Sequence, residues 1–475
     1  MARILMVTSE AAPFAKTGGL ADVLGSLPPA LVERGEEVAV VLPAYASIDL
    51  SGAERIYNEL TVWMDGGSRY DCSVERIVRQ GVHYLFVNCP PMYQRPGIYG
   101  DRHGDFGDNH LRFAVLCRAA LAISSRIFRP DVIHCHDWQA SLVPVYLKST
   151  FRHDPVFYGI KTLLTIHNLG YQGRFGASVL PDIAVPVQDV MHPEGIEYFG
   201  DVNLLKGGIV YSDYITTVSP RYAQEIQTPE FGFGLDPLLR ARRFFIAGIL
   251  NGVDYAEWNP QTDRYLPAWY DEASLAGKLT CKKALLEEFY MPTDKLETRP
   301  LLGIVSRFAH QKGLDLVADC IQGIADLGVQ MVVLGSGDAA LERTFGSFAQ
   351  ARPEQFGYRG GYNEGLAHRI EAGSDMFLMP SRYEPCGLNQ IYSLKYGTIP
   401  VVRATGGLDD AVTASTGFKF FNSTAHDLYN CIRYATTQFA ARESWEQRMR
   451  LGMMQDFSWA LSAERYAELY RRLRQ

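Results

Sequence analysis

The sequence of 475 residues contains no run of about 18 consecutive apolar residues, the length that a transmembrane helix requires. After Arg3 there is only a brief apolar run before the acidic Glu10, so a secretory signal peptide is not expected. The 8 cysteines are scattered and none forms a C-x-x-C pair, which fits a reducing compartment better than a disulfide framework. These absences predict a cytoplasmic protein without a membrane partner.

Positive charge is also not in excess. The chain has 46 Lys and Arg residues against 53 Asp and Glu residues, a formal net charge of −7. This balance argues against nucleic acid or an anionic membrane as a general partner, while a local basic cluster could still bind a phosphorylated small molecule.

Short continuous apolar runs, each ending in turn residues and separated by helix-length segments, occur along the whole chain. Such runs indicate buried parallel strands and an α/β fold. The length exceeds what one hydrophobic core usually supports, so two domains are expected, with a boundary after residues 249–254. Residues 459–473 have helical spacing and predict a packing helix. The predicted strands are 4–7, 131–134, 162–166, 301–305, 331–334, 376–379 and 399–402.

A glycine-rich turn follows the first apolar run, in the segment Lys16-Thr17-Gly18-Gly19-Leu20-Ala21-Asp22. Paired glycines let backbone N–H groups approach an anion, and a helix beginning there directs its positive end at the same point. The segment fits neither the dinucleotide fingerprint nor the P-loop, because its lysine precedes the glycines. A near-copy at residues 404–412 outweighs the alternative of an ordinary tight turn and implies two related half-chains.

Two later segments also follow predicted strands. Arg307 and Lys312 lie five positions apart and would together neutralise a diphosphate. Glu384 precedes Gly387 and a predicted helix start, where a carboxylate is unfavourable beside a phosphate unless a cationic group lies between them. A sugar carbon with oxocarbenium character would be such a group, whereas a helix-capping role is the alternative for Glu384.

Three further patterns carry weaker signals. The segment His134-Cys135-His136-Asp137-Trp138 has no second ligand pair nearby, so we favour delivery of Asp137 and Trp138 to a substrate over a metal site. His167 could hydrogen-bond substrate hydroxyls or be a structural histidine. Residues 335–340 fit a loose G-x-G-x-x-A pattern, which is weak evidence for a dinucleotide.

Taken together, these segments resemble the bacterial glycogen synthase and plant starch synthase family of retaining glycosyltransferases. The resemblance extends from Thr8-Ser9-Glu10 to Asp456-Phe457-Ser458-Trp459 and includes residues 108–113, 168–173, 219–239, 251–254 and 387–390. It implies the α/β fold called GT-B, with two Rossmann-like domains facing across a deep cleft. The expected domains are residues 1–253, on the acceptor side, and 254–456, on the donor side, with a C-terminal helix at 457–475 that returns to the N-terminal domain.

The resemblance also implies roles for individual residues. Lys16, Arg307 and Lys312 would bind the donor phosphates, supported by the backbone at Gly19, Gly387 and Leu388. Glu384 would face the reacting glucose, His167 its hydroxyls, and Asp137 the glucose or the acceptor. Tyr362 would lie against the nucleotide base. The remaining residues expected to bind substrate are Gly18, Asp22, Asn251 and Cys386.

The implied reaction transfers glucose from a nucleotide sugar, ADP-glucose in preference to UDP-glucose, to the 4-hydroxyl at the non-reducing end of an α-1,4-glucan with retention of configuration. No metal ion or other cofactor is expected. Alternatives are UDP-glucose as donor, a glucan phosphorylase, for which no cofactor-lysine signature is evident, and a catalytically silent glucan-binding scaffold. Retention of Lys16, Arg307, Lys312 and Glu384 argues against the scaffold.

Overall fold

A computed structural model describes residues 1–64 and 67–475. Its contacts divide the chain into two compact units. The first unit comprises Met1–Val218, Ala223–Gly252 and Trp459–Gln475, and the second comprises Ser219–Tyr222 and Val253–Ser458. The predicted domain bounds, 1–253 and 254–456, and the acceptor and donor roles given to the two domains stay predictions.

The first unit is built on a sheet with the strand order β14-β13-β9-β8-β1-β2-β5-β4-β3. Strands from β14 to β5 run parallel, whereas β4 and β3 extend the sheet as an antiparallel pair. The parallel strands are β1 (Arg3–Val7), β2 (Glu37–Pro43), β5 (Val82–Asn88), β8 (Val132–His136), β9 (Lys161–Ile166), β13 (Tyr214–Thr217) and β14 (Ile246–Gly248). The antiparallel strands are β3 (Glu54–Trp63) and β4 (Arg69–Arg79). Strands β1, β8 and β9 are buried along almost their whole length, as expected for strands covered on both faces.

The helices of the first unit connect and cover these strands. They are α1 (Gly19–Glu33), α2 (Pro90–Tyr93), α3 (Asn109–Arg126), α4 (Asp137–Ala140), α5 (Leu142–Lys148), α6 (Val187–Val190), α7 (Leu204–Tyr211), α9 (Asp236–Ala241) and α18 (Trp459–Leu473). Helix α8 (Pro220–Glu225) contains residues of both units. Short strands complete the unit: β6 (Gly100–Asp101), β7 (Gly104–Asp105), β10 (Arg174–Phe175), β11 (Glu197–Tyr198) and β12 (Asp201–Asn203).

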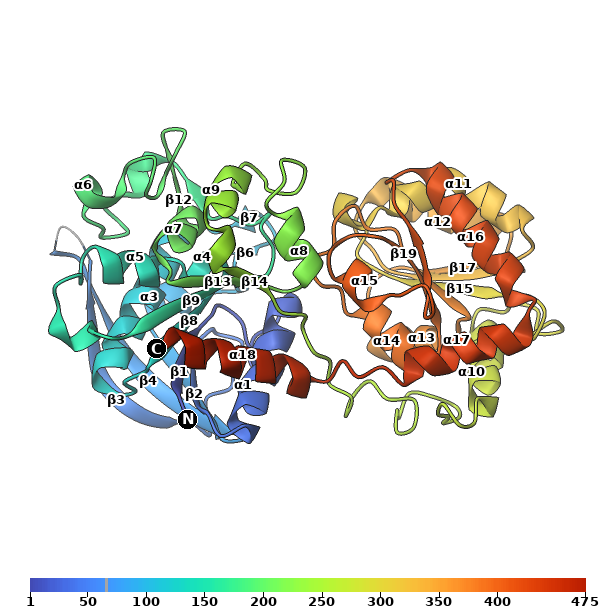
Figure 1. Ribbon diagram of the computed structural model, residues 1–475, viewed down its shortest axis with the longest axis horizontal. Helices are drawn as coiled ribbons and strands as arrows, with labels where there is room; N and C mark the ends of the chain where they lie inside the picture. Colours follow the sequence, from blue (N-terminus) through green and yellow to red (C-terminus); the bar gives the residue numbers. More distant parts are fainter. Residues whose placement is uncertain (65–66) are drawn as a thin grey trace. The chain divides into compact units, whose positions relative to one another are not determined.

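Helix α18, the last helix of the chain, packs against the first helix, α1 (Figure 1). Its buried positions Trp459, Ala463, Tyr466 and Tyr470 recur at helical spacing and join the same hydrophobic core as Leu24. The backbone at Ala460 accepts a hydrogen bond of 2.8 Å from Arg34 Nη2. The predicted return of a C-terminal helix to the first unit is therefore confirmed, and both chain termini lie in this unit (Figure 1).

The second unit has a six-stranded parallel sheet with the order β17-β16-β15-β18-β19-β20. Its strands are β15 (Leu301–Val305), β16 (Gln330–Leu334), β17 (Phe356–Arg359), β18 (Met376–Met379), β19 (Ile399–Arg403) and β20 (Phe418–Phe420). Its helices are α10 (Ala276–Glu288), α11 (Leu314–Asp326), α12 (Ala339–Ala351), α13 (Glu364–Gly373), α14 (Asn389–Lys395), α15 (Gly406–Ala411), α16 (Ala425–Phe439) and α17 (Arg442–Met453). The strand order changes direction around β15 and β18, so the loops after these two neighbours meet at one edge.

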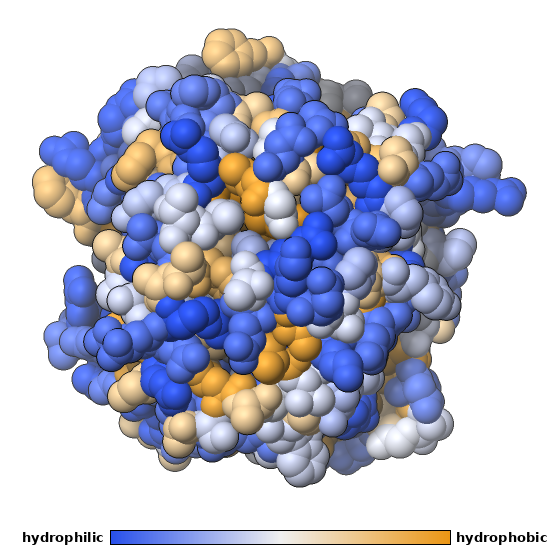
Figure 2. Space-filling model, turned by 90° about the vertical axis from the view of Figure 1, so that its right-hand side faces the viewer, coloured by the Kyte–Doolittle hydropathy of each residue, from blue (hydrophilic) through white to orange (hydrophobic). Residues whose placement is uncertain are grey.

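Hydrophilic side chains cover most of the face of the molecule seen in Figure 2, and apolar residues show there in separate patches. Within the described residues, no helix combines the length and apolar character needed to cross a membrane.

Candidate functional site

In the first unit, four of the predicted site positions follow the carboxyl ends of strands in the parallel sheet. Lys16 lies between β1 and α1, Asp137 directly follows β8, His167 directly follows β9, and Asn251 follows β14. Strands β9, β8 and β1 are adjacent in the sheet, so their loops lie at the same edge. We call Lys16, Asp137, His167 and Asn251 the first-unit cluster.

The glycine turn before α1 is open to solvent. Gly18 and Gly19 are exposed, and a Cβ built on either would meet no atom of the described residues within 4 Å. The packing of the protein therefore does not require glycine at these positions. A ligand that approaches the turn would require glycine there, because a side chain would cover the backbone N–H groups at the start of the helix.

Glu10, which the sequence analysis did not select, organises this turn. Its buried carboxylate accepts hydrogen bonds from the N–H and the hydroxyl of Thr17, from the N–H of Gly18 at 3.2 Å and from the Tyr99 hydroxyl at 2.5 Å. The N–H groups of Thr17 and Gly18 are thus already satisfied by the protein. Of the predicted pair of glycines, Gly19 is the one whose N–H starts the helix without an intrahelical acceptor.

Lys16 is exposed and forms an ion pair with Asp22, with 2.6 Å between Nζ and Oδ1. Asp22 was predicted to bind substrate. In the structure it is the counter-ion of the lysine, one turn into α1. An acid in the first turn also complements the helix dipole.

Asp137 has a left-handed backbone, with φ of 56°, at the junction of β8 and α4. Such a conformation is uncommon outside glycine, although aspartate tolerates it better than most residues. The Asp137 carboxylate accepts a hydrogen bond of 2.7 Å from the N–H of His167. Desolvation raises the pKa of Asp137 to about 7, against backbone hydrogen bonds that lower it, and the charge of Glu10 adds to the rise. The carboxyl therefore titrates near neutral pH.

Two histidines of β8, His134 and His136, and His167, directly after β9, contact one another. His167 Nε2 lies 3.0 Å from His136 Nδ1, and the rings of His136 and His134 lie 4.1 Å apart. Hydrogen bonds to Tyr470 and Thr165 occupy both ring nitrogens of His134. Burial lowers the pKa of His167 to about 3 and those of His134 and His136 well below their ordinary value. All three imidazoles are therefore neutral, and His136 Nε2 is buried without a hydrogen-bond partner among the described residues.

Two side chains of the first unit are less accessible than the sequence analysis expected. Trp138 was expected to reach a substrate, but it is only 9% exposed and packs edge-on against Phe113 and Phe175. The expectation was wrong because the left-handed turn at Asp137 begins a helix whose next residue points into the core. Asn251 is also buried, and its Oδ1 has no hydrogen-bond partner among the described residues.

In the second unit, the loops after the neighbouring strands β15 and β18 bring two predicted residues into contact. Lys312 Nζ lies 2.6 Å from Glu384 Oε2, and the Ser381 hydroxyl donates to the same oxygen at 2.9 Å. The side chain of Glu384 is 7% exposed and that of Lys312 is 21% exposed. We call Arg307, Lys312, Tyr362 and Glu384 the second-unit cluster.

The other two members of this cluster are exposed. Arg307 follows β15, and no described residue forms an ion pair or hydrogen bond with its guanidinium. Tyr362 follows β17, and 75% of it is exposed. Both residues lie at the carboxyl edge of a parallel sheet, where ligands of open α/β sheets bind.

Hydrogen bonds from the Gln390 side chain hold the backbone of the segment that follows Glu384. Gly387 has φ of 70°, and the Gln390 side chain donates to the carbonyl groups of Cys386 and Gly387 at 3.0 Å each. Cys386 is buried, whereas Leu388 is partly exposed immediately before α14. The structure thus places Gly387 and Leu388 at a helix start, as predicted, and Cys386 in the interior beside it.

The second glycine pair differs from the first. Gly406 and Gly407 are buried, and a Cβ on them would lie 1.9 Å from the carbonyl oxygen of Glu384 and 2.0 Å from that of Cys386. The N–H of Gly407 donates to the carbonyl of Glu384 at 3.1 Å. Although the two segments are similar in sequence, the later one supports the backbone that carries Glu384. The glycines of residues 335–337 likewise pack against the backbone of Ser306 and Phe308, at the turn before α12.

Arg382 is a further residue that the sequence analysis missed. Its guanidinium binds the Asp315 carboxylate in a bidentate pair at 2.7 and 2.5 Å, and its N–H donates to the carbonyl of Gln311 at 2.8 Å. It thereby fastens the loop of Glu384 to that of Lys312. The sequence signal was a basic residue two positions before Glu384, but its partner lies 67 residues earlier.

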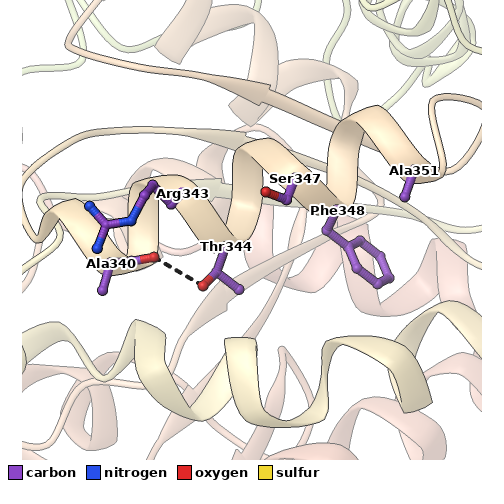
Figure 3. A pocket seen from close by; sticks show the side chains of 6 residues that line it. All are labelled: Ala340, Arg343, Thr344, Ser347, Phe348 and Ala351. Carbon is purple, nitrogen blue, oxygen red and sulfur yellow. Dashed lines mark hydrogen bonds between the residues drawn. The ribbon is translucent and has the colours of Figure 1, made fainter.

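One hollow in the second unit's surface lies along α12 and is lined by Ala340, Arg343, Thr344, Ser347, Phe348 and Ala351 (Figure 3). Thr344 there donates to the carbonyl of Ala340 at 2.9 Å within the helix (Figure 3). None of the predicted site residues lines this hollow. We assign it no role, because its only charged group, Arg343, has no convergent polar partner on the lining.

Comparisons with known proteins identify the family of this chain. Residues 3–241 match the starch synthase catalytic domain, and residues 287–451 match glycosyl transferases group 1. A glycogen synthase of Koribacter versatilis is 46% identical over 479 residues, which cover 99% of this chain and 98% of the relative. The chain belongs to the glycogen synthase and starch synthase family. Its members are glycosyltransferases, so the predicted enzyme class is confirmed.

Two solved structures extend this result to the fold. The catalytic domain of starch synthase IV from Arabidopsis thaliana, bound to ADP and acarbose, matches with a TM-score of 0.87 and 32% identity over 100% of this chain and 99% of that one. Sucrose-phosphate synthase from Thermosynechococcus elongatus matches with a TM-score of 0.59 and 16% identity over 99% of this chain and 98% of that one, which concerns the fold alone. The GT-B fold predicted for this member of the glycogen synthase and starch synthase family is confirmed.

Proposed function

We propose that the protein transfers glucose from ADP-glucose to the 4-hydroxyl at the non-reducing end of an α-1,4-glucan, with retention of the anomeric configuration. Membership of the glycogen synthase and starch synthase family supports the reaction class. The presence of ADP and acarbose, a glucan-like ligand, in the structure of starch synthase IV supports a nucleotide sugar and a glucan as substrates. The scattered cysteines favour the cytoplasm as the proposed location.

The observation that carries the proposal is the contact between Lys312 and Glu384, since Lys312 lies in the same loop after β15 as the exposed Arg307. An ammonium group has three donors, so Lys312 can hold Glu384 with one and a phosphate oxygen with another. Arg307 presents a planar fork that suits a second phosphate. The two cations would stabilise the departing diphosphate, and they would do so most strongly as its charge develops.

Glu384 would then act on the sugar. Its carboxylate is fixed by Lys312 and Ser381, so it is oriented before any substrate binds. Retaining glycosidases use two carboxylates about 5 to 5.5 Å apart, one of which attacks the anomeric carbon. Within the second-unit cluster Glu384 is the one carboxylate, which favours electrostatic stabilisation of an oxocarbenium-like carbon and attack by the acceptor on the face that the diphosphate leaves.

The remaining predicted residues complete the proposal. Lys16 and the N–H of Gly19 would contribute to phosphate binding, and Tyr362 would stack on the base. His167 and Asp137 would bind glucose or acceptor hydroxyls, and Asn251, with its buried unpartnered Oδ1, would accept a hydrogen bond from the substrate. None of these roles requires a metal ion or an organic cofactor, and we propose that the transfer uses neither.

The test measures glucose incorporation into glycogen and release of nucleoside diphosphate, with ADP-glucose and UDP-glucose assayed side by side. Wild type is compared with Glu384→Gln, which keeps the shape of the side chain, and with Glu354→Gln, which removes an exposed carboxylate of the same unit. We expect transfer from ADP-glucose in wild type and the control and its loss in Glu384→Gln. If the protein preferred UDP-glucose, then UDP-glucose and not ADP-glucose would be its donor. Glucan binding without transfer from either donor would indicate a scaffold.

A further inference from the structure

A second group of charged and imidazole side chains lies at the start of α13, in the second unit. Glu364 and His368 are four residues apart on this helix and therefore share one face. Glu257 comes from the segment that precedes the second unit's sheet. One ligand atom from each of the three residues lies within 4.8 Å of the other two. This spacing brings two carboxylates together beside one imidazole.

One ring nitrogen of His368 forms a hydrogen bond, and the other has no partner among the described residues. His368 is fully buried, and its Nδ1 lies 2.7 Å from Oδ2 of Asp263. The same carboxylate oxygen accepts a hydrogen bond of 2.6 Å from the Tyr396 hydroxyl, so Asp263 acts as an acceptor and Nδ1 must carry the hydrogen. Nε2 is then left with its lone pair. It is buried and has no hydrogen-bond partner among the described residues.

Stacking fixes the orientation of this ring. The Trp258 ring lies 3.7 Å from His368 with an interplanar angle of 12°, and Tyr392 stacks on Trp258 at 3.9 Å and 4°. Trp258 is also the neighbour of Glu257 in the chain, so the stack holds the backbone of Glu257 near the imidazole. A histidine that is hydrogen-bonded to a carboxylate through one nitrogen and held in place by its surroundings is the usual form of a metal ligand.

We propose that Glu257, Glu364 and His368 bind a divalent transition-metal ion of the Zn²⁺ type. Two carboxylates so close together repel each other, and a buried acceptor without a hydrogen-bond partner is unfavourable. A cation removes both costs at once. The nitrogen ligand favours Zn²⁺ or Co²⁺ over Mg²⁺ and Ca²⁺, which prefer oxygen alone.

The geometry needs only small side-chain movements. Bonds of about 2.0 Å in a tetrahedral site place ligand atoms roughly 3.3 Å apart, so the present separations of up to 4.8 Å have to shorten. Glu257 and Glu364 lie at the surface, whereas the ring of His368 is already oriented. Water would complete the coordination. Arg264, which is exposed and near enough to both glutamates to be affected by their charge, would lower the affinity without supplying a ligand.

The bound ion would connect the segment from Glu257 to Asp263 with helix α13. It would take no part in the proposed glucose transfer, because none of its ligands belongs to the second-unit cluster. The presence of the metal site therefore does not depend on the proposed function, and its test measures metal binding instead of enzyme activity.

The experiment titrates chelator-treated full-length protein with Zn²⁺ by calorimetry and with Co²⁺ by visible absorption. Wild type is compared with the double variant E257Q/E364Q and with the control E297Q/E354Q, which removes two exposed carboxylates elsewhere in the same unit. All four positions are exposed, so the variants are expected to fold. We expect one equivalent of Zn²⁺ in wild type and control, and at least about tenfold weaker binding in E257Q/E364Q together with loss of the Co²⁺ absorption.

Three results would overturn the proposal. These are equal Zn²⁺ affinity and stoichiometry in wild type and E257Q/E364Q, absence of a Zn²⁺ equivalent in wild type, and displacement of Zn²⁺ by an equal concentration of Mg²⁺. The last result would mean that the carboxylates attract cations by charge alone.

Discussion

His136 Nδ1 lies 3.0 Å from His167 Nε2, and His136 is completely buried between that ring and His134. Because burial keeps both imidazoles neutral, one nitrogen of the pair donates and the other accepts. The orientation of the His167 ring is therefore set by a residue that does not itself reach the surface.

Replacing His136 by phenylalanine should lower kcat by about tenfold, which corresponds to the loss of one hydrogen bond of roughly 1.4 kcal/mol. The apolar ring keeps the packing with His134 but no longer fixes His167. Steady-state kinetics with ADP-glucose and glycogen measure the effect, and His136→Asn, which retains a hydrogen-bonding group, should recover part of the loss. Unchanged kcat in His136→Phe would show that His167 is positioned by other contacts.

Asp137 should make the protein less stable as the pH rises. Its pKa is about 7 in the folded protein against an ordinary value of 3.8, so the folded state binds the proton more tightly and loses this advantage between about pH 4 and pH 7. At about 1.4 kcal/mol per pKa unit, the loss is at most about 4 kcal/mol. Asp137→Asn should therefore be more stable than wild type at pH 8, with the difference vanishing near pH 4.

Thermal unfolding of both proteins from pH 4 to pH 8 measures this difference, with the exposed Asp319→Asn as control. A pH-independent difference between wild type and Asp137→Asn would contradict the raised pKa.

Replacing Lys312 by alanine should reduce turnover at saturating donor by roughly 10² to 10³, as for removal of one group that stabilises the transition state. The variant should also unfold at lower urea concentration, because Glu384 is buried and loses its counter-ion. Lys283→Ala removes an exposed lysine from α10 and serves as the control for both measurements. Near-normal turnover in Lys312→Ala would remove this residue from the proposed mechanism.

The two glycine pairs should respond in opposite ways to alanine. At Gly19 a Cβ would meet none of the described atoms within 4 Å, so Gly19→Ala should fold normally and gain up to about 1 kcal/mol of helix stability. It should nevertheless raise the KM for ADP-glucose, because the methyl group would cover the N–H at the helix start. At Gly406, φ is +46° and the Cβ would lie 1.9 Å from the Glu384 carbonyl, so Gly406→Ala should lose both stability and activity.

Circular dichroism melts and donor titrations of the two variants separate these effects. A donor KM that is unchanged in Gly19→Ala would mean that the open turn does not approach the substrate.

Much of the fold could be predicted because its strands are buried on both faces. The apolar runs at 4–7, 162–166, 301–305 and 376–379 all lie within strands of the two sheets, and the helical spacing at 459–473 coincides with α18. The antiparallel pair of β3 and β4 was not predicted, because its strands are largely exposed and polar and lack a continuous apolar run.

The site was only partly predictable from sequence. Residue types at strand ends indicated Lys312 and Glu384, but the contact between them depends on the adjacency of β15 and β18, which local sequence does not specify. Glu10 was missed for the same reason, since its role depends on the turn at residues 17–18 and on Tyr99. The roles proposed for the individual site residues stay predictions.

Helix α18 gives the molecule an order of assembly. Trp459, Tyr466 and Tyr470 fill the core of the first unit, yet they are synthesised only after every residue of the second unit. At a synthesis rate of about 5 to 20 residues per second, α18 is added tens of seconds after the strands of the first unit. The first unit is therefore synthesised first but completed last. Until α18 has been synthesised, the apolar core residues that pack against this helix lack their partner.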